Sequence, residues 1–131
     1  MQQKAKIIWF AITTTLFTYG VVLFSIGKLQ TYSFPTQFDR PLELISLVAP
    51  LALFANLTLY RRLMSKAKNP QAMMFATIIA LAMNEFISIM GFVATFTSPE
   101  GNGFFFIANA AVTLLGNILV FPSGDWESKR V

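Results

Sequence analysis

The chain has 131 residues, of which 55% are hydrophobic and only 12% are charged. An ordinary soluble domain is about 25% charged, and so short a chain cannot hide this much apolar surface in one soluble core. The composition therefore predicts an all-α integral membrane protein, with residues 1–131 in a single transmembrane bundle. The chain contains neither cysteine nor histidine, which excludes disulfides and thiolate sites and removes the commonest protein ligand of zinc and haem.

Four apolar runs predict four transmembrane helices, over residues 7–27, 42–60, 72–97 and 103–122. The first run is too long for the apolar part of a signal peptide, and no typical cleavage site follows it, so we expect a retained helix. Pro50 is expected to kink the second helix because proline removes one backbone hydrogen bond. Pro70 is expected to start the third helix, since proline is favoured in a first turn.

Basic residues gather on one side of the predicted spans. Lys4 and Lys6 precede the first span, and Lys129 and Arg130 follow the fourth. The short loop between the second and third spans holds Arg61, Arg62, Lys66, Lys68, Asn69 and Pro70. The positive-inside rule then places both termini and this loop in the cytoplasm. The same cations can also bind anionic lipid head groups or a cytoplasmic partner, although setting the topology is the simpler interpretation.

Glu85 lies near the middle of the third span, where no other side chain from Ala72 to Thr97 is ionisable. A charged group at the centre of a membrane helix costs about 2.5 kcal/mol or more, and such groups usually have a function. A dry site favours the protonated carboxyl, which would ionise on meeting water or a cation, as a proton carrier requires. Asn84, Ser88 or a threonine of the first span, which carries Thr13, Thr14, Thr15 and Thr18, could add ligands for sodium, but no full set is evident and protons are favoured. The simpler alternative is a protonated acid that only hydrogen-bonds a neighbouring helix.

Small and polar residues recur at every fourth position in the third and fourth spans. This spacing places them on one face of a helix, where small side chains permit close helix–helix approach and amides can hydrogen-bond across the seam. The sequence therefore predicts helix-packing positions at Ala72, Ala76, Ala80, Asn109, Thr113 and Asn117. Gly91, a small residue near the end of the third span, is predicted to be a further packing position.

A weak internal similarity links the first and third spans. Residues 18–22 (Thr-Tyr-Gly-Val-Val) are similar to residues 89–93 (Ile-Met-Gly-Phe-Val), and Asn56 in the second span corresponds to Asn117 in the fourth. On this alignment Thr14 occupies the position of Glu85. Two duplicated hairpins, with the acid kept in one, would explain the pattern, although apolar helices also align by chance.

Two stretches resemble a known family. Residues 66–72 (Lys-Ala-Lys-Asn-Pro-Gln-Ala) and residues 80–93, in which Gly91 follows Glu85 by six positions, resemble the polar loop and second helix of the c subunit of F-type and V-type ATP synthases, the rotor-ring proteolipid. The resemblance covers residues 66–96 and implies an ion-carrying role for Glu85 and a cytoplasmic position for Asn69 and Pro70. The chain departs from the family in its two extra spans and in a second span that has Pro50 and no glycine.

Together these observations predict a small proteolipid-like membrane subunit that binds or translocates protons at Glu85 within a multi-subunit complex. One alternative is a non-catalytic structural or assembly subunit of a larger membrane complex. Another is a small dimeric cation or multidrug transporter with Glu85 at its substrate site. No nucleophile–base pair, phosphate loop or metal cluster is recognisable, so we expect no enzyme activity, cofactor or nucleic-acid partner. The expected partners are the lipid bilayer and other membrane subunits, in a homo- or hetero-oligomer, in a bacterial inner (plasma) membrane.

Overall fold

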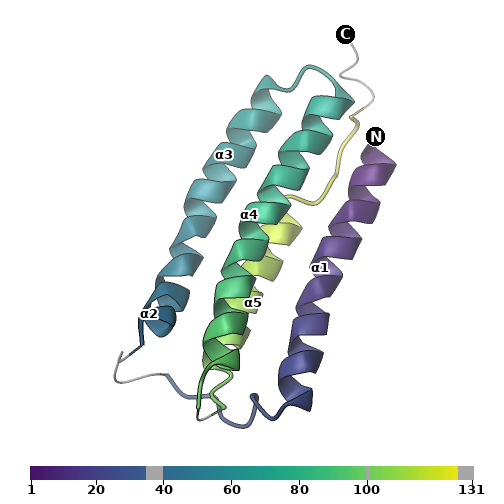
Figure 1. Cartoon of the computed structure of the whole chain (residues 1–131). Coiled ribbons are helices and arrows are strands. Elements are labelled where there is room, and N and C mark those ends of the chain that lie inside the picture. The colour runs from purple at the N-terminus through teal and green to yellow at the C-terminus, as the bar shows by residue number, and fades with distance from the viewer. Residues whose placement is uncertain (35–39, 100, 127–131) are drawn as a thin grey trace.

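The computed structural model describes residues 1–34, 40–99 and 101–126 of the chain. The helices there are α1 (Gln2–Ser25), α2 (Pro41–Val48), η1 (Ala49–Leu51), α3 (Ala52–Lys66), α4 (Pro70–Phe96) and α5 (Phe104–Leu119). The long helices lie side by side in an up-and-down bundle, and α1 begins at the same end as the turn between α3 and α4 (Figure 1). This agrees with the predicted all-α bundle.

Helix α4 is the centre of the bundle. It lies between α1 and α3, with α5 packed behind it (Figure 1). In the most apolar 18-residue stretch of α4, 44% of the residues are buried. The corresponding share is 17% in α1 and 22% in the helix that runs from α2 through α3. The side chains that α4 buries recur every three or four residues along one broad face, as expected of a helix that packs against several neighbours. Glu85 is therefore carried by the most enclosed helix in the bundle.

Among the residues that the structure describes, three helices are long and apolar enough to cross a membrane: Gln2–Ser25, Pro41–Lys66 and Pro70–Phe96. The fourth, α5, is shorter than predicted and has 16 residues, which is about 24 Å against the roughly 30 Å of a bilayer core. Large apolar side chains lie exposed on the outside of every long helix, including Phe17, Phe54 and Phe75, which are 63–72% exposed. Such an exterior suits lipid rather than water.

The segment after α5 continues towards the N-terminus of α1 without helical structure. Gln2 Nε2 donates hydrogen bonds to the carbonyl oxygens of Gly124 (2.8 Å) and Pro122 (3.4 Å). Val120 is fully buried, and Trp126 is 1% exposed in a cluster with Ala5. Irregular backbone at membrane depth requires such protein partners, which explains how the fourth helix can end early.

Pro50 interrupts the second helix and Pro70 begins the third, as the sequence predicts. Pro50 lies in η1, a short 3-10 segment that interrupts the helix between α2 and α3. Pro70 is the first residue of α4, and the Asn69 side chain caps that helix by accepting a hydrogen bond from the backbone N–H of Ala72 at 2.9 Å. The second helix does not end near Tyr60 as predicted.

Helix α3 instead continues to Lys66, so most of the predicted basic loop is helical. Arginine, leucine, methionine and lysine are all good helix formers. Met64 also packs against the buried cluster that contains Ala67 and Met73, which stabilises the last turn. Arg61 and Lys66 are therefore exposed on a helix, and only residues 67–69 connect α3 to α4.

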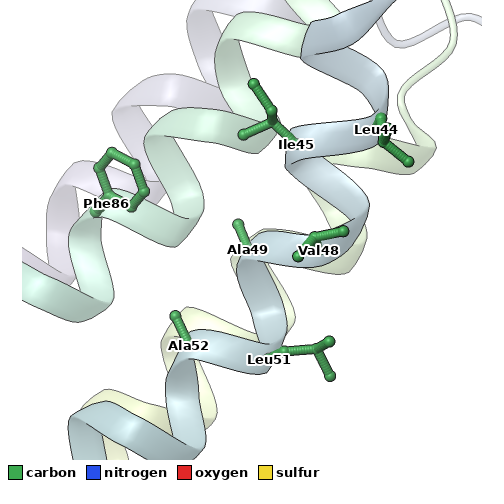
Figure 2. A pocket seen from close by; sticks show the side chains of 7 residues that line it. All are labelled: Leu44, Ile45, Val48, Ala49, Leu51, Ala52 and Phe86. Atoms are coloured by element: carbon green, nitrogen blue, oxygen red, sulfur yellow. The ribbon is translucent and has the colours of Figure 1, made fainter.

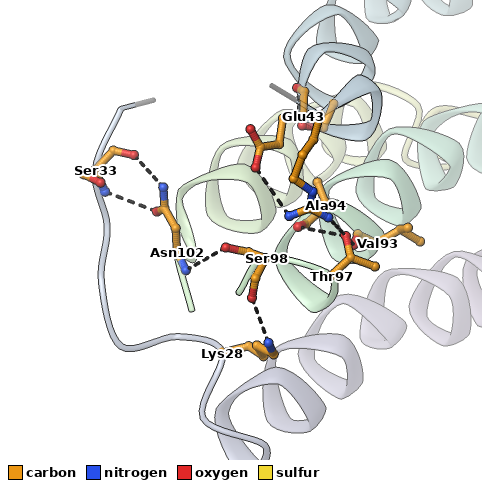
Figure 3. A network of polar contacts seen from close by, with 10 residues as sticks. Lys28, Ser33, Glu43, Val93, Ala94, Thr97, Ser98 and Asn102 are labelled. Carbon is orange, nitrogen blue, oxygen red and sulfur yellow. Dashed lines mark hydrogen bonds and ion pairs between the residues drawn. The ribbon is translucent and has the colours of Figure 1, made fainter. Parts of the chain in front are cut away.

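Polar contacts organise the opposite end of the bundle (Figure 3). Asn102 Oδ1 accepts a hydrogen bond from the Ser33 N–H at 3.2 Å, and Asn102 Nδ2 donates to the Ser33 carbonyl at 2.9 Å. Lys28 Nζ donates at 2.7 Å to a backbone carbonyl in the turn after α4. Arg40 forms an ion pair with Glu43 at 3.4 Å. These bonds tie the segments before α2 to the turn between α4 and α5.

Candidate functional site

The Glu85 carboxyl faces α1. Its Oε1 lies 2.7 Å from Thr15 Oγ1, and Tyr19, one turn further along α1, interacts with both Glu85 and Thr15. The other carboxyl oxygen, Oε2, is buried and has no hydrogen-bond partner. The site therefore consists of one carboxyl and two hydroxyl groups between two apolar helices.

No positive charge accompanies this carboxyl in the part of the chain that the structure describes. Helix α5 contains no ionisable side chain, and the α2–α3 helix carries its charges towards its ends, at Glu43 and at the basic residues from Arg61 onwards. On α1, the lysines lie in the first two turns, far along the sequence from Thr15. The ion pair seen among these residues joins Arg40 to Glu43. Glu85 is half-buried, so its ionised form would be a partly buried charge with no countercharge beside it.

Asn84, the residue before Glu85, points to other helices and forms a chain of buried hydrogen bonds. Asn56 Nδ2 donates to Asn84 Oδ1 at 3.2 Å, and Asn84 Nδ2 donates to Asn117 Oδ1 at 3.2 Å. Asn117 Nδ2 then donates to Thr13 Oγ1 at 3.1 Å. All four side chains are at most 6% exposed. One hydrogen-bonded chain therefore connects α3, α4, α5 and α1.

Two glycines permit close contact around these amides. A Cβ at Gly91 would lie 2.7 Å from both Asn109 Cβ and the Phe105 carbonyl oxygen of α5, and a Cβ at Gly116 would lie 2.8 Å from Asn84 Nδ2. Real Cβ contacts are almost never shorter than 3.0 Å. At Gly91 the backbone of α5 leaves no room for a side chain, and at Gly116 an added methyl group would displace the Leu53 and Asn84 side chains.

The three predicted ion-binding side chains are not brought together. Ser88 Oγ donates to the backbone carbonyl of Glu85 at 2.8 Å rather than to its carboxyl, and the Asn84 amide is engaged by α3 and α5. Consecutive residues of a helix point about 100° apart, so neighbours in sequence need not share a site. Beside the carboxyl the structure places Thr15, which is one of the four first-span threonines that the sequence offered, and Tyr19, which was not among the predicted site residues. Thr15 and Tyr19 are four residues apart, so the sequence already places their hydroxyl groups on one face of the first helix.

The other predicted residues divide into a buried and an exposed set. The predicted packing positions lie at the bundle interior, with Ala72 half-buried in the first turn of α4 and the rest buried: Ala76, Ala80, Gly91, Asn109, Thr113 and Asn117. Thr113 Oγ1 donates to the Asn84 carbonyl at 3.0 Å, whereas the Asn109 amide nitrogen is buried without a partner. The exposed set is Arg61, Arg62, Lys66, Lys68 and Asn69, and Pro70 beside them is buried.

An apolar groove of about 570 Å³ lies where the α2–α3 helix is interrupted (Figure 2). One side is Phe86 of α4, and the other is formed by Leu44, Ile45, Val48, Ala49, Leu51 and Ala52. None of these side chains can form a hydrogen bond or carry a charge. The groove suits hydrocarbon and contributes no chemistry of its own.

No group of three or more His, Cys, Asp or Glu side chains is placed to hold a metal ion in residues 1–34, 40–99 and 101–126. Comparison with family models, with curated proteins and with solved structures finds no match to this chain.

Proposed function

We propose that the protein is a small membrane subunit that binds and releases a proton at Glu85 within a multi-subunit complex. The observation that carries this proposal is the environment of the carboxyl. Glu85 Oε2 is buried without a hydrogen-bond partner, and no cation lies against the carboxyl in the described residues. Burying an unpaired charge costs far more than burying a neutral acid. The favoured occupant of this site is thus a proton on Glu85.

A sodium ion is a poorer fit to the same site. A bound cation needs several oxygen ligands in place of its water shell, and hard cations take about six. The carboxyl has the Thr15 and Tyr19 hydroxyl groups beside it, while Asn84 and Ser88 use their polar groups elsewhere. Too few oxygens are therefore available, and the proposed ligand is the proton.

Release of the proton requires a second chain. Apart from the weakly acidic Tyr19 hydroxyl group, the described spans offer no second acid or base next to Glu85 from which a proton relay could be built. A carboxyl between two apolar helices ionises when water or a positive group reaches it. An energy-coupled role therefore places a partner subunit with a polar or cationic group next to the α1–α4 seam. The resemblance of residues 66–96 to rotor-ring proteolipids supports this arrangement.

The proposed orientation has both termini in the cytoplasm of a bacterial inner membrane. Lys4 and Lys6 in α1 lie at the same end of the bundle as Arg61 and Lys66 at the end of α3 (Figure 1). Clustering of cations at one end is the pattern of the positive-inside rule.

The test uses the reconstituted protein and a carbodiimide, which reacts with protonated carboxyl groups buried in apolar sites. We expect labelling at Glu85 that falls as the pH rises, and no labelling there in Glu85→Gln. Glu43→Gln is the matched control, because Glu43 is paired with Arg40 at the end of the bundle. Once partners are known, Glu85→Gln abolishes coupled transport. Full coupled activity in that variant would overturn the proposal.

A structural or assembly subunit is the second candidate, and α5 favours it. This helix is short, and Ile107, Leu115 and Ile118 on it are 48–55% exposed, so a partner helix could cover that side. This candidate predicts that the protein purifies with a fixed set of other membrane subunits and is unstable alone. The composition of the oligomer purified in mild detergent distinguishes the two candidate functions. A homo-oligomer argues against a structural or assembly subunit.

A further inference from the structure

The hydroxyl group of Thr15 has two acceptor oxygens within hydrogen-bond distance, and the Tyr19 hydroxyl group also lies beside it. Thr15 Oγ1 lies 2.6 Å from the Ile12 carbonyl oxygen and 2.7 Å from Glu85 Oε1. Both distances are at the short end of the range for O–H···O hydrogen bonds. A hydroxyl group carries one proton, and a backbone carbonyl can only accept. If Glu85 were ionised, two acceptors would compete for that single proton.

A protonated Glu85 removes the competition. Its O–H donates to Thr15 Oγ1, and the Thr15 hydroxyl then donates to the Ile12 carbonyl, so that each oxygen has a compatible role. Threonine hydroxyl groups in helices commonly bond to the preceding turn in this way. The unpartnered Oε2 is then the carbonyl oxygen of a neutral acid, which is less costly to leave unbonded than a charged oxygen.

We infer that Thr15 is the residue that holds the Glu85 proton, and that α1 thereby sets how firmly the proton is bound. This inference rests on the proposed function and names its positioning residue. Thr15 selects for the proton because its oxygen accepts the carboxyl O–H, and a displacement of α1 from α4 removes this acceptor and favours release. The other titratable group that faces the carboxyl is Tyr19, also on α1. The charged side chains of α1, α2 and α3 lie near their ends, and α5 has none.

Thr14 provides a matched control on the same helix. Its hydroxyl group donates to the Phe10 carbonyl at 2.6 Å, just as Thr15 bonds to its own preceding turn, but Thr14 is exposed and does not contact Glu85. Valine has nearly the shape of threonine without the hydroxyl group. Thr14→Val and Thr15→Val therefore make the same chemical change, and only the second removes the acceptor of the Glu85 proton.

The experiment is infrared difference spectroscopy of the full chain in lipid nanodiscs over a range of pH. The carbonyl stretch of a protonated carboxylic acid is assigned to Glu85 by its loss in Glu85→Gln. At the pH where half of the wild-type band remains, we expect about one sixth to remain in Thr15→Val, because one hydrogen bond contributes about 1 kcal/mol, a factor of about five. The remaining band should move to higher frequency. Thr14→Val should match the wild type, and Thr15→Ser should restore both properties.

The outcomes separate this inference from the proposed function. Absence of a Glu85-dependent acid band at every pH would remove both. A band that is unchanged in Thr15→Val would overturn the inference and leave proton binding at Glu85 intact. A band that becomes stronger in Thr15→Val would also overturn it, since that result means that Thr15 donates to an ionised carboxylate. If Thr15→Val does not fold, Thr15→Ser and Thr15→Ala provide the same comparison.

Discussion

Replacing Gly91 by alanine tests the close approach of α4 and α5. The added methyl group would lie 2.7 Å from Asn109 Cβ and from the Phe105 carbonyl oxygen, against 3.4–4 Å for ordinary contacts. Both neighbours must move by about 0.7 Å (3.4 − 2.7), and neither is the end of a flexible side chain. Overpacking of this kind costs about 1–3 kcal/mol. Alanine also gains about 1 kcal/mol over glycine in a helix, so we expect Gly91→Ala to lower the free energy of unfolding by at most about 2 kcal/mol.

Gly20→Ala is the matched control, because Gly20 is also inside a long helix. Its added methyl group would meet the Phe106 ring at 3.6 Å, which is an ordinary contact. Alanine gains about 1 kcal/mol over glycine in a helix, and this gain is common to both variants. Gly91→Ala should therefore be less stable than Gly20→Ala by about 1–3 kcal/mol.

The assay is reversible unfolding in mixed micelles of mild detergent and dodecyl sulfate, followed by far-UV circular dichroism. Unfolding free energies of the two variants that agree within about 0.5 kcal/mol would refute the close packing of α4 and α5 at Gly91. Such a result would also remove the physical reason for glycine at this position.

Three further changes test other parts of the bundle. Asn84→Ala removes two buried hydrogen bonds between amide side chains. It should lower the free energy of unfolding by about 1–3 kcal/mol in the same assay, since interhelical hydrogen bonds in membranes average about 0.6 kcal/mol with a maximum near 1.7. Thr58→Ala, at an exposed position, should change this free energy little. Asn102→Ala removes the bonds that hold the loop before α2, so limited proteolysis should cut there faster than in the wild type. Arg62→Gln combined with Lys66→Gln should weaken stabilisation by anionic lipid by about 1 kcal/mol for each cation, and high salt should hide the difference.

The chemistry of proline made the start of α4 and the interruption between α2 and α3 predictable from the sequence. Proline has no backbone N–H, so the 3-10 segment at Pro50 and the start of α4 at Pro70 follow from the residues themselves. The end of α3 was not predictable in this way. The apolar run ends at Tyr60, but the helix continues to Lys66. The residues after Tyr60 are good helix formers, and Met64 packs against a buried cluster that stabilises the last turn.

The partner of Glu85 depends on how α1 is rotated against α4. The first span carries four threonines, and two neighbours, Thr14 and Thr15, differ by only one position. About 100° of rotation separates them, and this rotation is fixed by contacts distant in sequence, such as the hydrogen bond from Trp9 to the carbonyl of Asn117. The cost of an acid in a membrane identifies Glu85 from the sequence, but the sequence alone does not say which of the four threonines lies beside it.

Asn84 and Glu85 attach α1 to α4 by two different routes. Glu85 bonds directly to Thr15, and Asn84 reaches Thr13 through Asn117. Because Thr13 and Thr15 are on one helix, one route can compensate in part for the loss of the other, while the hydrogen bond from Trp9 to the Asn117 carbonyl is present in every variant. The double variant Asn84→Ala/Thr15→Val should therefore lose more stability than the sum of the single variants, by about 0.5 kcal/mol or more. Thr14→Val combined with Asn84→Ala should be additive, because Thr14 belongs to neither route. Additivity in both pairs would contradict a shared role of the two routes, and α1 would then be held in place by its apolar contacts.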